Sequence, residues 1–130
     1  MTRYDPAVAP EAGEWLALDE LSRIELVEAH HRAAGVELPN TRVHASIHCI
    51  VENQIAQGVK SVLDAMSRLG GEGLSRHDAV HAIGSVLTDL IYNAAKRSKD
   101  ANPFAFSQEQ YDAKLKRLTV KGWHRKYGPR

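Results

Sequence analysis

The chain has 130 residues, of which 43% are hydrophobic, and this fits one globular domain with a core of modest size. Seventeen lysines and arginines against sixteen aspartates and glutamates give a formal net charge of +1, which favours neither a nucleic-acid nor a membrane partner for the domain as a whole. Only 6% of the residues are aromatic, so we expect an aliphatic core.

The first predicted helix follows an irregular lead-in that covers residues 1–16. It spans about residues 19–34, where apolar side chains recur at helical spacing, and Gly35 ends the run. Residues 36–40 predict a turn, because they contain a proline and end in Asn40, a favoured N-cap residue.

The next two predicted helices span about residues 41–57 and 59–69. Gly58 separates them in the interpretation that we favour. The alternative is one long helix that runs through this glycine at a cost of about 1 kcal/mol relative to alanine. The glycine-rich segment 70–74 then predicts a loop.

A fourth helix is predicted over about residues 76–96. Ser75 precedes it, and together with Asp78 it resembles a capping box in which aspartate replaces the usual Glu or Gln. A polar linker follows. Residues 107–118 predict a short helix with Ser107 as its N-cap, and a basic tail comes after it.

These elements predict an all-α fold, because no segment shows the alternation of a strand. We expect a helical bundle of about four core helices plus a short C-terminal helix. The expected organisation is a lead-in over 1–16, a bundle domain over 17–97, and a linker, short helix and basic tail over 98–130.

The C-terminal segment VKGWHRKYGPR, residues 120–130, interleaves basic and aromatic side chains. Such a segment can bind nucleic acid, since bases stack on Trp and Tyr while Lys and Arg contact phosphates. We favour a solvated terminus whose Trp123 packs on the bundle. We therefore expect no nucleic-acid partner.

The cysteine content and the length of the apolar segments indicate which cellular compartment we expect. The one cysteine, Cys49, excludes an intramolecular disulfide and a thiolate-based zinc site. No apolar run reaches the roughly 18–20 residues that a membrane-spanning helix needs. Residues 1–15 lack the apolar stretch of a signal peptide. We expect a cytoplasmic protein with no membrane partner.

Histidines recur at a spacing of four residues in two segments, HASIH at 44–48 and HDAVH at 77–81. Residues i and i+4 share one face of an α-helix, so each pair can bind a metal ion. Neither pair contains the glutamate of the HExxH zinc-protease motif. The sequence therefore supplies the ligand spacing twice without that motif.

Chain direction predicts that the two pairs lie at one level of the bundle. If Gly58 separates two helices and successive helices run antiparallel, both pairs lie in the first turns of two parallel helices. The helix over 19–34 runs in the opposite direction, so its last turns reach the same level. The N-terminal ends of helices disfavour a bound cation, so carboxylates would be needed nearby.

Five histidines and two glutamates are the candidate metal ligands. His31 is preferred to His30 because adjacent helical residues point about 100° apart and His31 continues the apolar face. Glu52 continues the His44–His48 face and could be a ligand, a hydrogen-bond partner of an imidazole, a base acting on metal-bound water, or a surface carboxylate. The full candidate set is His31, His44, His48, His77, His81, Glu28 and Glu52.

Nitrogen and oxygen ligands without thiolates suit Zn, Fe, Ni or Mn, bound as one ion or two. Hydrolysis by metal-bound hydroxide and oxygen chemistry at iron are both open, as are sensing and storage. The sequence therefore predicts a metal-binding bundle and leaves open whether it is a hydrolase, an oxidoreductase or no enzyme.

Residues 24–97 resemble a bacterial family of small helical proteins catalogued only as a domain of unknown function. The resemblance rests on His31, on the His44–His48 pair followed by Gln54, and on HDAVH at 77–81. It implies that the five histidines form a set. It implies no reaction.

Two other hypotheses remain open. The first is a metal-free helical interaction module without catalytic activity, in which Leu16, Leu18 and Leu21 form an interface between copies of the chain and build a homo-oligomer. The second, which the sequence favours least, is a nucleic-acid contact made by residues 114–130.

Overall fold

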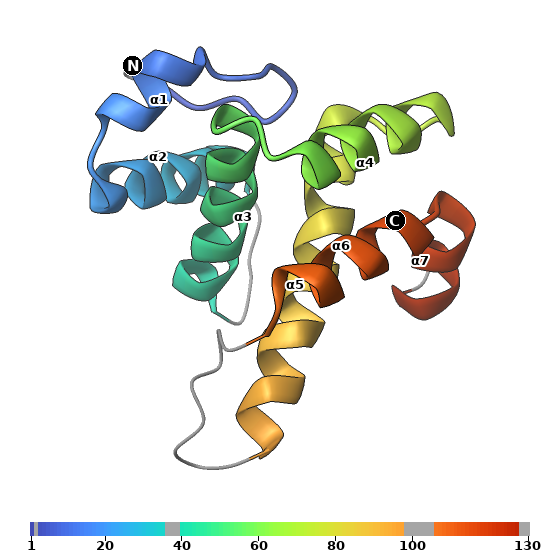
Figure 1. Cartoon of the computed structure of the whole chain (residues 1–130). Coiled ribbons are helices and arrows are strands. Elements are labelled where there is room, and N and C mark those ends of the chain that lie inside the picture. Colours follow the sequence, from blue (N-terminus) through green and yellow to red (C-terminus); the bar gives the residue numbers. More distant parts are fainter. Residues whose placement is uncertain (2, 36–39, 98–105, 128–130) are drawn as a thin grey trace. The chain divides into compact units, whose positions relative to one another are not determined.

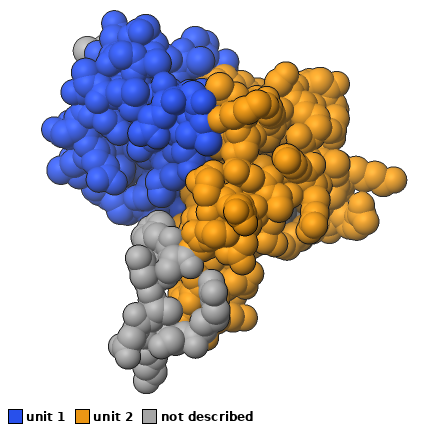
Figure 2. All heavy atoms as spheres, viewed as in Figure 1, with its two compact units in different colours: residues 1–59 blue, residues 60–130 orange. Residues whose placement is uncertain are grey.

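A computed structural model describes the chain except residues 2, 36–39, 98–105 and 128–130. The described residues form seven helices and no strand (Figure 1), so the all-α prediction is confirmed. Their contacts divide the chain into two compact units, unit 1 at Met1–Val59 and unit 2 at Lys60–Arg130 (Figure 2). Among the helices described, none combines the length and the apolarity that crossing a bilayer requires.

Unit 1 contains α1 (Ala12–Ala17), α2 (Glu20–Ala33) and α3 (Thr41–Ala56), and α3 packs against both of the others. The helices predicted over residues 19–34 and 41–57 correspond to α2 and α3, whose ends lie within about a residue of the expected positions. The short helix α1 was not predicted, because all of it except Ala17 lies in the stretch assigned to the lead-in.

Side-chain caps explain where these helices begin. The Asp19 carboxylate accepts a hydrogen bond from the Ser22 backbone N–H at 2.7 Å, and this bond lowers the pKa of the Asp19 carboxyl below its ordinary value. The Asn40 side chain accepts one from the Val43 N–H at 3.1 Å. Each bond satisfies a backbone donor that the first helical turn leaves without a partner.

Gly58 ends α3, as predicted, and residues 41–69 are not one continuous helix. Its φ of 73° lies in the left-handed region, which glycine adopts without a Cβ penalty. The Gly58 N–H donates to the Ile55 carbonyl and the Val59 N–H donates to the Gln54 carbonyl, at 3.1 and 3.0 Å. This pair of bonds is the Schellman motif, which satisfies the last carbonyls of the helix.

The core is more aromatic than the composition suggested. Trp15, Trp123, Tyr4 and Tyr111 are the four largest of the fully buried side chains. In unit 1, Trp15 and Tyr4 lie with their ring centroids 5.5 Å apart in a cluster that includes Val27. Most of the buried hydrophobic side chains are aliphatic, as predicted, although the largest of them are aromatic.

Unit 2 contains α4 (Lys60–Gly71), α5 (Arg76–Arg97), α6 (Gln108–Arg117) and α7 (Val120–Tyr127). The first three pack on one another. The helix α4 continues through two of the glycines assigned to the loop at 70–74. Ser107 caps α6 in a complete capping box with Gln110, and Ser75 accepts a hydrogen bond from the Asp78 N–H at 3.2 Å.

The C-terminal segment is helical where a solvated tail was expected. Arg68 donates to the carbonyls of Leu115 and Leu118, at 2.6 and 2.8 Å, and so fixes the turn between α6 and α7. Trp123, on α7, is 1% exposed. The expectation that Trp123 packs on the bundle is confirmed, and its burial explains why the segment folds back as a helix.

Candidate metal centre

Unit 1 brings three of the predicted ligands together. His31 extends from α2, and His44 and His48 extend from α3. Each offers one ring nitrogen, and these three nitrogens lie within 4.8 Å of one another. Zinc–nitrogen bonds of about 2.0–2.1 Å require ligand atoms on the order of 3.3 Å apart, so the rings would have to move closer together to hold one ion.

The local sequence explains this convergence. His44 and His48 lie one turn apart on α3, so they share a face, and their ring centroids are 6.1 Å apart. His31 lies in the last turn of α2, with its ring centroid 4.8 Å from that of His44 and 5.5 Å from that of His48. The last turn of α2 therefore meets the first turns of α3, as chain direction predicted for this half of the site.

The position of the cluster suits a cation better than the sequence suggested. The N-terminal turns of α3 disfavour positive charge, whereas the C-terminal turn of α2 favours it. His31 and His48 are each 2% exposed, and His44 is half-buried. A bound ion would therefore have two buried ligands and one half-buried ligand.

His48 belongs to a hydrogen-bonded series of three buried side chains, in which Tyr4 and Glu52 lie behind it. The Tyr4 hydroxyl donates to a carboxylate oxygen of Glu52, and the Tyr4 oxygen lies 2.9 Å from Nε2 of His48. Tyr4 and Glu52 are each 1% exposed. The series therefore links Glu52 to His48 through a tyrosine rather than by direct contact.

With Glu52 ionised, these hydrogen bonds favour one tautomer of His48. A carboxylate can only accept hydrogen bonds, so the single Tyr4 proton goes to Glu52. The Tyr4 oxygen must then accept from His48, which places the imidazole proton on Nε2. Neutral His48 consequently carries its lone pair on Nδ1, the form in which histidine binds a metal ion while its other nitrogen is held by a hydrogen bond.

Glu28 and Glu52, the two predicted carboxylate ligands, have other contacts in the structure. Glu28 pairs with Arg42, with Nη2 and Oε1 3.1 Å apart, and its side chain is 12% exposed. Glu52 holds Tyr4, which agrees with the alternative in which it supports an imidazole indirectly. Direct ligation by either carboxylate stays a prediction.

The second histidine pair lies in unit 2. His77 and His81 occupy the first two turns of α5, and their ring centroids are 4.3 Å apart. The two rings therefore share one helix face, as the spacing predicted. Their binding of a metal together with the unit 1 histidines stays a prediction.

Tyr4 was missed at the level of sequence. It lies in the segment assigned to the irregular lead-in, and no periodicity marks it. The usable signal was weak: an aromatic residue a short distance before Trp15, with which it packs. Contacts between residues 44 or more positions apart, such as Tyr4 with His48, leave no local pattern.

Cys49, next to His48, points about 100° away from it around α3. Its Sγ lies 4.0 Å from Oδ1 of Asn53, which also accepts hydrogen bonds from Trp15 and Arg23. Burial raises the pKa of the Cys49 thiol to about 11, although the Arg23 charge acts in the opposite direction.

We expect Cys49 to react at least about 100-fold more slowly with a thiol-specific disulfide reagent at mildly alkaline pH when folded than in denaturant, because the thiolate is the nucleophile. The raised pKa stabilises the fold fully below the ordinary value of 9.0, and this contribution is lost as the pH rises through about 11. Absorbance of the released reagent measures the rate. Equal rates in native and denatured protein would show that the thiol is accessible.

Comparisons of the chain with protein-family models, with curated proteins and with solved structures found no match. The functional assignment therefore depends on the geometry of the site.

Proposed function

We propose that this protein binds a divalent transition-metal ion through the imidazoles of His31, His44 and His48. The observation that carries the proposal is the convergence of three ring nitrogens, from two helices, within 4.8 Å. Three protein ligands leave a coordination position for water or for a further ligand, the arrangement of catalytic zinc sites.

Charge and ligand type support a cation of intermediate softness. Imidazole suits Zn, Ni and Fe better than Mg or Ca, and Mn remains compatible if carboxylates join. Residues 1–59 contain nine Asp and Glu against four Arg and no Lys, so unit 1 carries a negative net charge that attracts a cation. The Glu52 carboxylate adds negative charge behind His48 through Tyr4.

We extend the proposal to His77 and His81, whose rings lie side by side on α5. Alanine at both positions is expected to weaken zinc binding without changing its stoichiometry if the pair completes the coordination of the same ion. A fall from two bound ions to one is expected if the pair holds a separate ion. An unchanged isotherm would limit the site to the three histidines of unit 1.

The chemistry that such a site supports depends on the ion. Zinc with a water in the open position lowers the pKa of that water towards neutrality and so favours hydrolysis. Iron would favour an oxidoreductase, and a site closed by further histidines would favour storage or sensing. Metal binding is the common element, and it is the function that we propose.

The direct test is metal analysis of the full chain purified without a histidine tag, followed by zinc titration in a calorimeter. We expect at least one tightly bound equivalent and a melting temperature that rises with zinc concentration, since a ligand that binds the folded state stabilises it. Less than about 0.2 equivalents, with a melting temperature unchanged by zinc or iron, would contradict the proposal.

That outcome would instead favour the metal-free interaction module. Leu16 is 36% exposed and Leu21 is 55% exposed, so both are available for contact with another copy, whereas Leu18 packs against the core. Analytical ultracentrifugation of the chain with and without zinc separates the two functions, because a module that needs no metal associates equally in both.

Substituting Tyr4 by phenylalanine tests how His48 is positioned. The variant keeps the ring that packs on Trp15 but removes the hydroxyl between His48 and Glu52. We expect zinc affinity to fall about 10–100-fold, the range found when the hydrogen-bond partner behind a metal ligand is lost. Circular dichroism checks that the variant folds, and an affinity equal to that of the parent would show that the tyrosine has no part in binding.

A further inference from the structure

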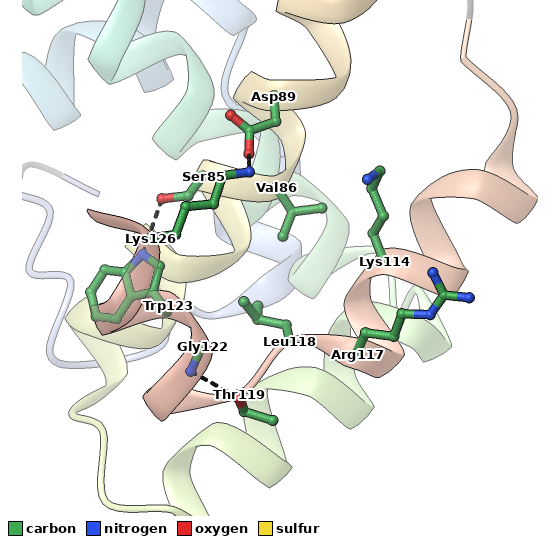
Figure 3. A pocket seen from close by; sticks show the side chains of 10 residues that line it. All are labelled: Ser85, Val86, Asp89, Lys114, Arg117, Leu118, Thr119, Gly122, Trp123 and Lys126. Carbon is green, nitrogen blue, oxygen red and sulfur yellow. Dashed lines mark hydrogen bonds and ion pairs between the residues drawn. The ribbon is translucent and has the colours of Figure 1, made fainter. Parts of the chain in front are cut away.

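Unit 2 contains a pocket that the proposed metal site does not use. It lies between α5, α6 and α7, and its volume is about 300 Å³. Figure 3 shows its lining, with Val86 and Leu118 in the middle, Trp123 on one side, and Lys114 and Arg117 on the other. This volume is at the lower end of the range for small-molecule sites.

The inner part of the pocket is apolar and rigidly held. The Trp123 ring is 1% exposed, and its Nε1–H donates to Oγ of Ser85 at 3.2 Å. Ser85 donates in turn to the His81 carbonyl at 2.9 Å. The indole is therefore fixed against α5, and the half-buried side chains of Val86 and Leu118 form the surface against which an apolar group can pack.

The mouth of the pocket is cationic. Lys114, Arg117 and Lys126 line it together with one carboxylate, that of Asp89. Asp89 is paired with Lys126 at 2.6 Å, which leaves two positive charges in excess. Across the part of the chain that the structure describes, no carboxylate lies within ion-pair distance of Lys114 or Arg117.

Unit 2 as a whole is positively charged, like the mouth of the pocket. Of the seventeen Lys and Arg in the chain, thirteen lie in residues 60–130, against seven of the sixteen Asp and Glu. The near-zero net charge of the whole chain therefore hides a basic unit. Such a unit attracts anions to its surface, most strongly where low-dielectric walls border the charges.

We propose that this pocket binds a phosphate monoester carried on a small apolar or aromatic group. The two excess positive charges match a phosphate dianion better than a single carboxylate. Arg117 offers the planar donor pair that binds phosphate oxygens, and Lys114 adds a point charge. The ester group would pack on Val86 and Leu118, beside the Trp123 indole. This inference is independent of the proposed metal site.

Burial of Trp123 favours a small ligand over a nucleic acid. A base can stack only on an aromatic face that solvent reaches, and this indole is 1% exposed. Binding of an oligonucleotide by the basic side chains of α6 and α7 would instead be electrostatic and spread over all of them, including Lys116, which is exposed and outside the pocket.

The test is a titration of the ¹⁵N-labelled full chain with phenyl phosphate, followed by the two tryptophan indole resonances. We expect a saturable shift of the Trp123 resonance and none of Trp15, which lies in unit 1 and serves as an internal reference. Benzoate, with one charge, is expected to bind at least about tenfold more weakly, and phenol, with none, more weakly still.

Variants on α6 localise the binding. Alanine at both Lys114 and Arg117 should weaken phenyl phosphate binding by at least about tenfold, because each charge-assisted hydrogen bond contributes at least that much. Lys116→Ala removes an equal charge from the same helix outside the pocket and should leave binding within twofold. Both variants keep Trp123 as the reporter.

Three results would overturn the assignment. The first is the absence of a saturable Trp123 shift in the parent chain. The second is equal weakening by Lys116→Ala and by the double variant. The third is tighter binding of an oligonucleotide than of phenyl phosphate, provided that this binding weakens with salt and that each basic side chain of α6 contributes to it. That result would assign the surface to nucleic acid.

Discussion

Replacing His48 by alanine is expected to lower the zinc affinity of the full chain by more than about 100-fold, beyond the loss expected when only the hydrogen-bond partner of a ligand is removed. Nε2 of His48 lies 2.9 Å from the hydroxyl oxygen of the buried Tyr4, which positions the imidazole. Its loss removes a ligand atom and leaves Tyr4 and Glu52 without the imidazole. Calorimetric titration with zinc measures the affinity.

Two further variants separate the loss of a metal ligand from a loss of the fold. His44 is half-buried and is a predicted ligand, so His44→Ala should disturb the fold less than His48→Ala while still weakening zinc binding. His124→Ala removes an imidazole on α7, whose ring stacks near Trp123 in unit 2. An affinity loss in His124→Ala as large as in His44→Ala would contradict a site built from specific histidines.

Trp15→Ala is expected to cost about 3–5 kcal/mol of the free energy of unfolding, the range for deleting a large buried aromatic side chain. Trp15 is 0% exposed, packs on Tyr4, and donates from Nε1 to Asn53 at 2.9 Å. The short helix α1 holds it against α3, so its removal should also loosen Tyr4 and weaken the metal site. Urea denaturation followed by circular dichroism measures the change.

Trp15→Phe is the matched variant. It retains an aromatic ring in the core and removes the indole N–H, so it should cost less than Trp15→Ala. Asn53 keeps its hydrogen bond from Arg23, at 3.1 Å, which limits the penalty of the lost donor. A cost below about 1 kcal/mol for Trp15→Ala would show that α1 contributes little to unit 1.

Local chemistry explains which helices were predictable. Gly58 was identified as a boundary because a residue without a Cβ can adopt its φ of 73°, and Asn40, Ser75 and Ser107 cap helices as their side chains indicated. The helices α1 and α7 were missed because they are six and eight residues long and are held by tertiary contacts of Trp15 and Trp123.

The site was predictable only in part, for the same reason. Spacing identified His44 with His48 and His77 with His81, since i and i+4 contacts are local. Chain direction added His31. The tyrosine that links His48 to Glu52 comes from a segment without periodicity, and the pairing of Glu28 with Arg42 depends on side-chain contacts between helices that no spacing rule describes.

The distribution of charge also emerged only with the fold. The net charge of +1 suggested no preference for charged partners, yet the boundary between Val59 and Lys60 divides an acidic unit from a basic one. This separation favours cation binding by one and anion binding by the other. Composition averages over the whole chain and so cannot reveal it.

X-ray absorption at the zinc edge of the metal-loaded chain tests most directly whether histidines hold the ion. We expect nitrogen or oxygen neighbours at about 2.0–2.1 Å and the more distant scattering of at least three imidazole rings, with no sulfur neighbour although Cys49 is adjacent to His48. A zinc spectrum with fewer than two imidazoles, or with a sulfur neighbour at about 2.3 Å, would contradict the three-histidine site.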